Sequence, residues 1–106
     1  MTRRRVIIQP DAEFEIDQIA RYLSHDSLSV ALRFYDAVDE TCKLLAWMPG
    51  IGKRRIAKDP ALRYLRSWSV KGFRKYLIFY IPGKRQIEIV HVIHGSRDLP
   101  GAIGVE

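Results

Sequence analysis

Two apolar segments in the C-terminal half of the chain dominate its hydrophobic pattern. The first covers residues 73–81 and the second residues 87–94, and both are rich in β-branched and aromatic side chains. Pro82 and Gly83 lie between them, where proline presets φ at one central position of a turn and glycine tolerates positive φ at the next. Neither segment alternates cleanly between apolar and polar residues, which is typical of strands covered on both faces. The pattern therefore predicts a β-hairpin in the middle of a sheet.

Alternation along the two strands predicts which side chains share a face. In the first strand, Leu77, Phe79 and Ile81 alternate with Tyr76, Ile78 and Tyr80. In the second strand, Ile87, Ile89, His91 and Ile93 alternate with Glu88, Val90, Val92 and His94. We expect Tyr76 and Tyr80 to be core aromatics, and we expect His91 to lie in the core or to support a neighbouring group.

Apolar residues at helical spacing mark a segment that begins at Pro10. Proline is tolerated in the first turn of a helix, and Asp11 and Glu13 place negative charge beside the positive end of the helix dipole. The apolar stripe consists of Ala12, Ile16, Ile19, Ala20 and Leu23. The pattern breaks at residues 24–27, so the predicted helix ends there.

A second helical segment follows, which Ser27 or Ser29 can cap. Its stripe consists of Ala31, Phe34, Val38, Thr41, Leu45 and Met48, widened by Tyr35, Cys42 and Leu44. Pro49 and Gly50 end the segment. Two helices joined by so short a connection predict an antiparallel helical hairpin.

Residues 6–8 and 65–70 complete the regular structure as two further strands. Helices grouped before strands indicate an α+β fold. We expect an N-terminal strand, an antiparallel helical hairpin and a three-stranded antiparallel meander in one mainly antiparallel sheet, with the helices on one face. The 106 residues suit one domain, residues 1–106, with an ordered core at about residues 6–99 and a loose tail at residues 100–106.

The chain is basic, with a formal net charge of +6 and a pI of about 9.8. Such a charge attracts nucleic acid or an acidic protein, because both carry the complementary field. No apolar run approaches the ~20 residues of a membrane helix, and the N-terminus lacks the apolar region of a signal peptide. The single Cys42 cannot form an internal disulfide, and no Cys/His spacing resembles a metal site. These features predict a cytoplasmic protein with no metal and no membrane contact.

The densest basic run is Lys53-Arg54-Arg55, which lies beside Gly50 and Gly52. Such a run forms either a solvated loop or a cradle for phosphate groups. The spacing of the two glycines does not match a P-loop, so nucleotide binding is excluded.

Two blocks of sequence carry a resemblance to a known family. They are Tyr76-Leu77-Ile78-Phe79-Tyr80 and Val92-Ile93-His94-Gly95-Ser96-Arg97-Asp98. The matching positions in the helical segments are ordinary core spacing and add less. From about Ile8 to Leu99, the chain resembles a ParE-type toxin of the RelE/ParE superfamily, from bacterial type II toxin–antitoxin modules.

The resemblance implies a small antiparallel sheet packed against a helical hairpin, in agreement with the fold predicted above. It implies growth arrest through inhibition of DNA gyrase rather than cleavage of messenger RNA. It also implies a cognate antitoxin, usually acidic in the part that binds the toxin. On this basis we expect a non-catalytic gyrase inhibitor without a cofactor. The residues expected to contact the target are Arg66, Arg74, His94 and Arg97.

The alternative is a RelE-like endonuclease that cuts ribosome-bound messenger RNA. Cleavage needs a proton acceptor for the ribose 2′-hydroxyl, a donor for the leaving 5′-oxygen, and cations around the phosphate. His91 or His94 would transfer the protons, and the cations would be Arg66, Arg74 and Arg97. The chain has no clear match to the Lys/Arg/Tyr set of RelE and ends its last strand in the ParE-like form His-Gly-Ser-Arg-Asp. The nuclease is therefore the second hypothesis.

Structural roles for the same residues stay open. His94 precedes Gly95 at a strand end, where it either makes a structural hydrogen bond or faces a partner. Arg97 either pairs with Asp98 and fixes the exit of the strand or lies on a partner surface. Arg66 either bridges to Asp98 or faces a partner.

Overall fold

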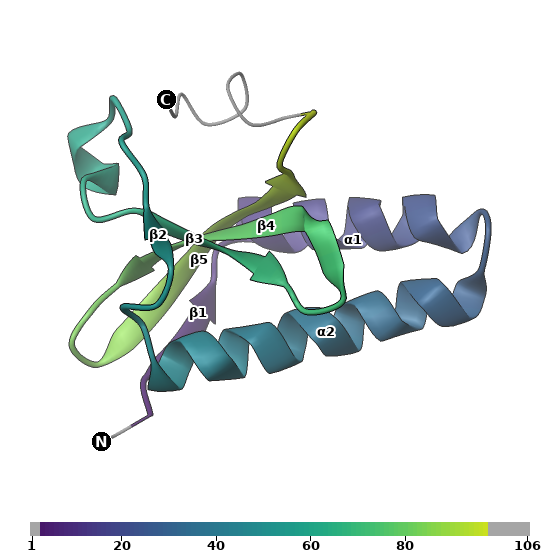
Figure 1. Ribbon diagram of the computed structural model, residues 1–106, viewed down its shortest axis with the longest axis horizontal. Coiled ribbons are helices and arrows are strands. Elements are labelled where there is room, and N and C mark those ends of the chain that lie inside the picture. The colour runs from purple at the N-terminus through teal and green to yellow at the C-terminus, as the bar shows by residue number, and fades with distance from the viewer. Residues whose placement is uncertain (1–2, 98–106) are drawn as a thin grey trace.

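The computed structural model describes residues 3–97. Its elements are β1 (Arg5–Ile8), α1 (Pro10–Ser24), α2 (Leu28–Trp47), β2 (Lys53–Arg54), the 3-10 helix η1 (Pro60–Leu62), β3 (Arg66–Val70), β4 (Phe73–Pro82) and β5 (Gln86–His94). The strands form one five-stranded sheet in the order β1-β5-β4-β3-β2 (Figure 1). The predicted tail at residues 100–106 and the predicted partner Asp98 lie outside the described residues.

The predicted hairpin of β4 and β5 occupies the middle of this sheet, as expected. The predicted turn was wrong in detail, because Pro82 is the last residue of β4 and Gly83 does not have a positive φ. A glycine fits at position 83 because a Cβ atom there would lie 2.7 Å from the Gln86 carbonyl oxygen. The three-stranded antiparallel meander β3-β4-β5 and the α+β fold are also confirmed. Two features add to the prediction. Strand β1 pairs with β5 in parallel, and Lys53 and Arg54 form a short fifth strand on the outer edge of β3. The sheet is therefore mixed, although most of its pairs are antiparallel.

A β-bulge at Val90 overturns the predicted faces of β5. Phe79 lies opposite His91 but Tyr80 lies opposite Ile89, so Val90 is an extra residue on β5. A bulge of this kind places two residues of one strand against one of its partner. Because alternation restarts there, grouping Ile87 and Ile89 with His91 and Ile93 was wrong. Ile87 and Ile89 belong to the core beneath the helices, and so does Val92 beyond the bulge. Ile93 is buried on the opposite face of the sheet.

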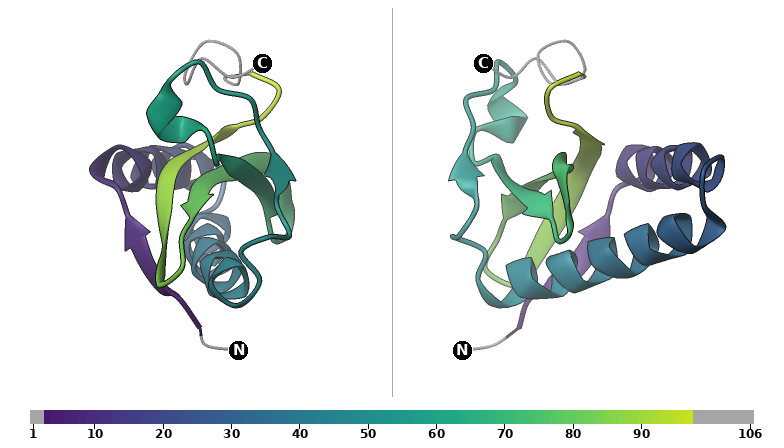
Figure 2. Two further views of the ribbon diagram at one scale, coloured as in Figure 1. Left: turned by 90° about the vertical axis from the view of Figure 1, so that its left-hand side faces the viewer. Right: turned by 45° about the vertical axis from the view of Figure 1, so that its right-hand side comes forward.

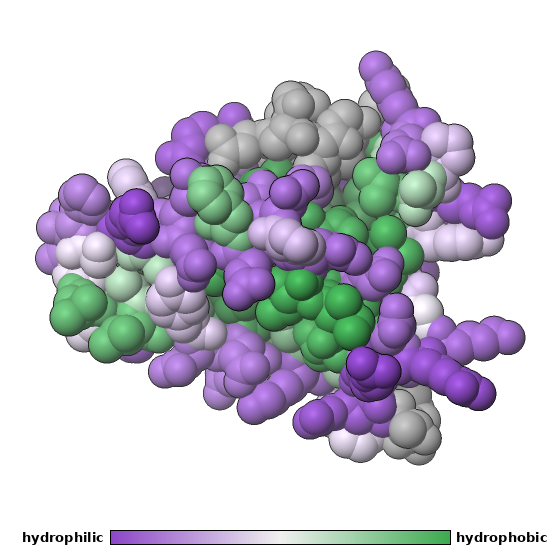
Figure 3. All heavy atoms as spheres, turned by 180° about the vertical axis from the view of Figure 1, so that it is seen from behind, coloured by the Kyte–Doolittle hydropathy of each residue, from purple (hydrophilic) through white to green (hydrophobic). Residues whose placement is uncertain are grey.

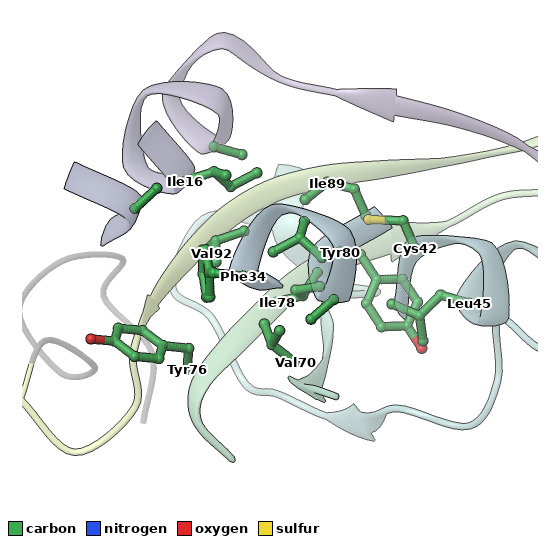
Figure 4. Packing of buried hydrophobic residues seen from close by; sticks show 14 of the residues in the cluster. Ile16, Phe34, Cys42, Leu45, Val70, Tyr76, Ile78, Tyr80, Ile89 and Val92 are labelled. Atoms are coloured by element: carbon green, nitrogen blue, oxygen red, sulfur yellow. The ribbon is translucent and has the colours of Figure 1, made fainter. Parts of the chain in front are cut away.

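The larger core lies between the helical hairpin and the sheet. Phe34 of α2 is fully buried, and its ring makes edge-to-face contacts with Phe73 and Tyr76 at centroid distances of 5.2 and 5.5 Å. Figure 4 shows side chains from both helices and from the sheet converging around it. Tyr76 and Tyr80 are buried, so both are core aromatics as predicted.

Local signals explain where the helices begin and end. Pro10 occupies the first turn of α1, and the Ser27 hydroxyl caps α2 by accepting a hydrogen bond from the Val30 N–H at 3.3 Å. The predicted stripe of α1 is confirmed. That of α2 is too wide, because Met48, Tyr35 and Leu44 are exposed.

A second apolar cluster covers the opposite face of the sheet. Leu65, Phe79 and Ile93 are buried there, with Ala57 and Leu62 packed against them from the segment around η1. Figure 2 shows this segment on one side of the sheet and the helical hairpin on the other. The fold thus has a helical layer, a sheet and a partial cover of irregular chain.

Candidate functional site

Three of the four predicted target-binding residues lie at one end of the central hairpin. His94 on β5 is opposite Tyr76 on β4, and the Gly95 N–H donates to the Lys75 carbonyl at 2.7 Å. Arg74 comes just before this point and is exposed, and so is Arg97 just after it. Their side chains line different grooves, however: that of Arg74 lies beside α2 and that of Arg97 beside α1.

His94 makes the structural hydrogen bond that was one of its two predicted roles. Its Nδ1 accepts a hydrogen bond from the Arg97 backbone N–H at 3.1 Å, and the Ser96 hydroxyl oxygen lies 3.3 Å from the same atom. Its ring stacks edge-to-face on Tyr76 at 5.4 Å. The lone pair of Nδ1 is therefore engaged within the strand exit.

Arg66 lies apart from these three residues. It is opposite Tyr80, four positions along β4 from Tyr76, which is about 13 Å at roughly 3.3 Å per residue. Its Nη1 donates to the carbonyls of Gly50 and Gly52 at 3.2 and 2.7 Å. The structure therefore does not bring all four predicted residues together. Arg66 instead holds the connection between α2 and β2.

The Tyr80 hydroxyl also holds the connection between α2 and β2. It accepts a hydrogen bond from the Gly52 N–H at 3.0 Å and donates to the Pro49 carbonyl at 2.6 Å. Burial raises the pKa of Tyr80, although the Gly52 N–H and the Arg66 charge act in the lowering direction. The phenol keeps its proton and remains a donor. Sequence reasoning placed Tyr80 in the core but missed this role, which depends on contacts far apart in the chain.

His91 has the supporting role that was predicted. Its Nδ1 lies 3.0 Å from a Glu15 carboxylate oxygen, and the same oxygen accepts the Val92 N–H at 3.1 Å. Glu15 therefore links α1 to the part of β5 that follows its pairing with β1.

The buried Cys42 is unreactive. Burial raises the pKa of its thiol to about 12, with a smaller contribution from the Asp39 carboxylate. The thiolate, which is the nucleophilic form, is therefore negligible at neutral pH. Cys42 acts as a small apolar core residue, as predicted.

Neither metal ligands nor a membrane span emerge from the described part of the chain. Among residues 3–97, no three His, Cys, Asp or Glu side chains are grouped so that they could hold a metal ion. No helix in the same range is long and apolar enough to cross a membrane.

Among residues 3–97, the helical hairpin carries most of the exposed large apolar side chains. Phe14, Tyr22, Leu28 and Leu32 are each more than half exposed. Figure 3 shows the molecule from behind, with apolar residues gathered in the middle of that face and at its left-hand end. A groove of about 700 Å³ runs between α1 and β5, and Tyr22 and Arg97 line it.

A solved structure described as "Chromosomal ParDE TA system from P. aeruginosa" matches with a TM-score of 0.66 and 16% identity, over 86% of this chain and 95% of that one. At that identity the match supports the fold alone. No curated protein matches the sequence. The family model described as "ParE toxin of type II toxin-antitoxin system, parDE" matches residues 6–99. The chain therefore belongs to the ParE toxin family of type II toxin–antitoxin systems.

Proposed function

We propose that this chain arrests growth by inhibiting DNA gyrase through protein–protein contact. The match to the ParE toxin family over residues 6–99 is the observation that carries the proposal. Family membership implies an antitoxin partner, and gyrase is the target that the sequence resemblance indicated. On this hypothesis the chain has no chemistry of its own and works in the cytoplasm. The contacts with gyrase would include Arg74, His94 and Arg97 at the end of the central hairpin.

The arrangement of the candidate nuclease residues supports inhibition by binding over RNA cleavage. A nuclease must hold its base, its acid and its cations around one phosphate. Here Arg66 is engaged with two backbone carbonyls and lies about 13 Å along the sheet from His94, at roughly 3.3 Å per residue. Nδ1 of His94 is also occupied by the Arg97 N–H. These contacts would have to be rebuilt before the residues could act on one phosphate.

The charge distribution supports an acidic antitoxin segment as the second partner. Residues 10–47 hold three Lys or Arg and eight Asp or Glu, a formal charge of −5, which leaves +11 for the rest of the chain because the total is +6. Opposite charges accelerate association and fix its orientation. An acidic segment would bind the sheet side, and exposed apolar side chains such as Phe14 and Leu32 could receive an amphipathic helix.

The RelE-like endonuclease is the competing function, and induction of the chain in cells separates the two. We expect plasmid supercoiling to change while the 5′ ends of transcripts stay intact. We expect His94→Ala to weaken growth arrest only partly, because Arg74 and Arg97 remain on the proposed gyrase surface, whereas loss of an acid or base would lower activity by about 10²–10⁴. His25→Ala, at the exposed end of α1, is the matched control. New transcript ends that disappear with His94→Ala would favour the nuclease instead.

A further inference from the structure

A strongly basic groove lies where the β4–β5 turn meets β2, β3 and the end of α2. Its volume is about 590 Å³. Of the nine residues among 3–97 that line it, four are cations, namely Arg4, Arg54, Arg66 and Lys84, and none is acidic. We call it the hairpin-tip groove. It lies at the end of the sheet away from His94 and Arg97, so it is separate from the surface proposed to contact gyrase.

Two of these cations are placed directly against each other by the strand register. Arg54 on β2 is opposite Arg66 on β3. The adjacent Arg55 N–H donates to the Leu65 carbonyl, so the two arginines form the closer, non-hydrogen-bonded type of antiparallel pair. Like charges directly opposite destabilise a sheet. A fold that keeps such a pair gains stability when an anion binds between the two side chains.

Backbone contacts fix two of the cations on the walls of the groove. Nε of Arg4 donates to the Gly83 carbonyl at 2.7 Å, and Arg66 holds the two carbonyls of the α2–β2 connection. A guanidinium has five N–H donors, so both arginines keep donors for a ligand. Within residues 3–97, neither Arg54 nor Lys84 has a side-chain hydrogen bond or ion pair. In this part of the chain no carboxylate forms an ion pair with either cation.

The groove also has an aromatic wall. Tyr64 lines it with 58% of its surface exposed, and the Arg63 guanidinium lies 4.9 Å from the centre of its ring. Proteins that bind single strands combine a basic groove for the backbone with aromatic rings on which bases stack. An acidic peptide would use the cations but would have no need of an exposed ring.

We propose that the hairpin-tip groove binds single-stranded nucleic acid, with its cations on successive phosphates and Tyr64 stacked on a base. This binding does not depend on the action on gyrase. On this proposal, part of the basic run at residues 53–55 binds phosphate groups, which was one of the two alternatives that the sequence left open. Arg54 contacts the ligand, whereas Arg55 is engaged within the protein, since its Nε donates to the Ser67 hydroxyl at 2.7 Å.

Fluorescence anisotropy with a labelled oligothymidylate of about 12 nucleotides tests the proposal, because such sites cover about 4–16 nucleotides. We expect Arg54→Gln/Lys84→Gln to weaken binding at least tenfold at low salt. The slope of the logarithm of the binding constant against the logarithm of the salt concentration should become about 1.4 less steep for the double variant. The reason is that each phosphate contact to a single strand contributes about 0.7 to this salt slope. Tyr64→Ala should weaken binding about 5- to 150-fold. All three residues are exposed, and equal urea midpoints will verify that the variants are folded.

The matched control removes the same charge from the helices, as Arg21→Gln/Arg33→Gln, and should leave the salt slope unchanged. A duplex of the same length should bind the wild-type chain more weakly and should not respond to Tyr64→Ala. The proposal is overturned if the oligonucleotide does not bind the wild-type chain. It is overturned as well if the groove double variant and the helix double variant weaken binding equally. It is also overturned if an oligoglutamate of equal charge displaces the oligonucleotide as well as an unlabelled copy does. No gyrase is present, so this result stands apart from the test of the proposed target.

Discussion

Replacing Phe34 with alanine is expected to lower the free energy of unfolding by about 3–5 kcal/mol. The side chain is fully buried between α2 and the sheet, and its ring contacts the rings of Phe73 and Tyr76. The substitution removes both contacts and leaves a cavity that the rigid strands beneath it cannot close. Urea unfolding followed by circular dichroism measures the loss directly.

The same substitution at Phe14 is the control, because that ring lies on α1 and is 63% exposed. Its effect should stay within about 0.5 kcal/mol of zero, as is usual for exposed positions. If the two variants unfolded at the same urea concentration, Phe34 would not occupy the centre of the core described above.

Replacing Gly52 with alanine is expected to destabilise the protein by about 2–4 kcal/mol. A Cβ atom at this position would overlap the hydroxyl of Tyr80 and lie 2.9 Å from the Ser67 carbonyl oxygen. Overpacking of this kind costs about 1–3 kcal/mol. Moving the Tyr80 ring aside also weakens its bonds to Pro49 and to residue 52, each worth about 1 kcal/mol.

Gly50 supplies the matched control two residues earlier. A Cβ atom there would meet no other atom within 4 Å, and the backbone does not need a positive φ. Alanine at this position should leave stability unchanged or raise it by up to about 1 kcal/mol, through the lower entropy of the unfolded chain. Both variants are compared by urea midpoint. Equal effects at the two glycines would contradict the close approach of Tyr80 to Gly52.

Local sequence signals were sufficient for most of the fold. The apolar strands of the hairpin, the start of α1 at Pro10 and the Ser27 cap of α2 all depend on neighbouring residues. The bulge at Val90 has no such signal, because it arises from how β5 pairs with β4. Strand β2 was not predicted either. Its two residues are exposed cations without alternation, and pairing with β3 alone makes them a strand.

The candidate site was less predictable for the same reason. The hydrogen bond of His94 could be foreseen because its partners are two and three residues away. The contacts of Arg66 could not, since its carbonyl partners lie 14 and 16 residues earlier in the chain. Its position opposite Arg54 likewise depends on strand register. Residue types suggested phosphate binding in this region, but only the fold shows which cations share a groove.

Membership of the ParE toxin family gives the chain its place in a type II toxin–antitoxin system. The gyrase hypothesis adds a target, and the hairpin-tip groove adds a second ligand at another end of the sheet. The two can be separated by mutation. Variants of Arg54 and Lys84 should alter nucleic-acid binding, while variants of Arg74 and Arg97 should alter inhibition of the target.

Supercoiling of a relaxed plasmid by purified DNA gyrase, with increasing amounts of the purified chain, is the most direct test of the proposed function. We predict that supercoiling falls as the chain is added and recovers when the cognate antitoxin is added in excess. Arg74→Ala/Arg97→Ala should require more protein for the same inhibition. Unchanged supercoiling over the concentrations at which the chain arrests growth would contradict the account.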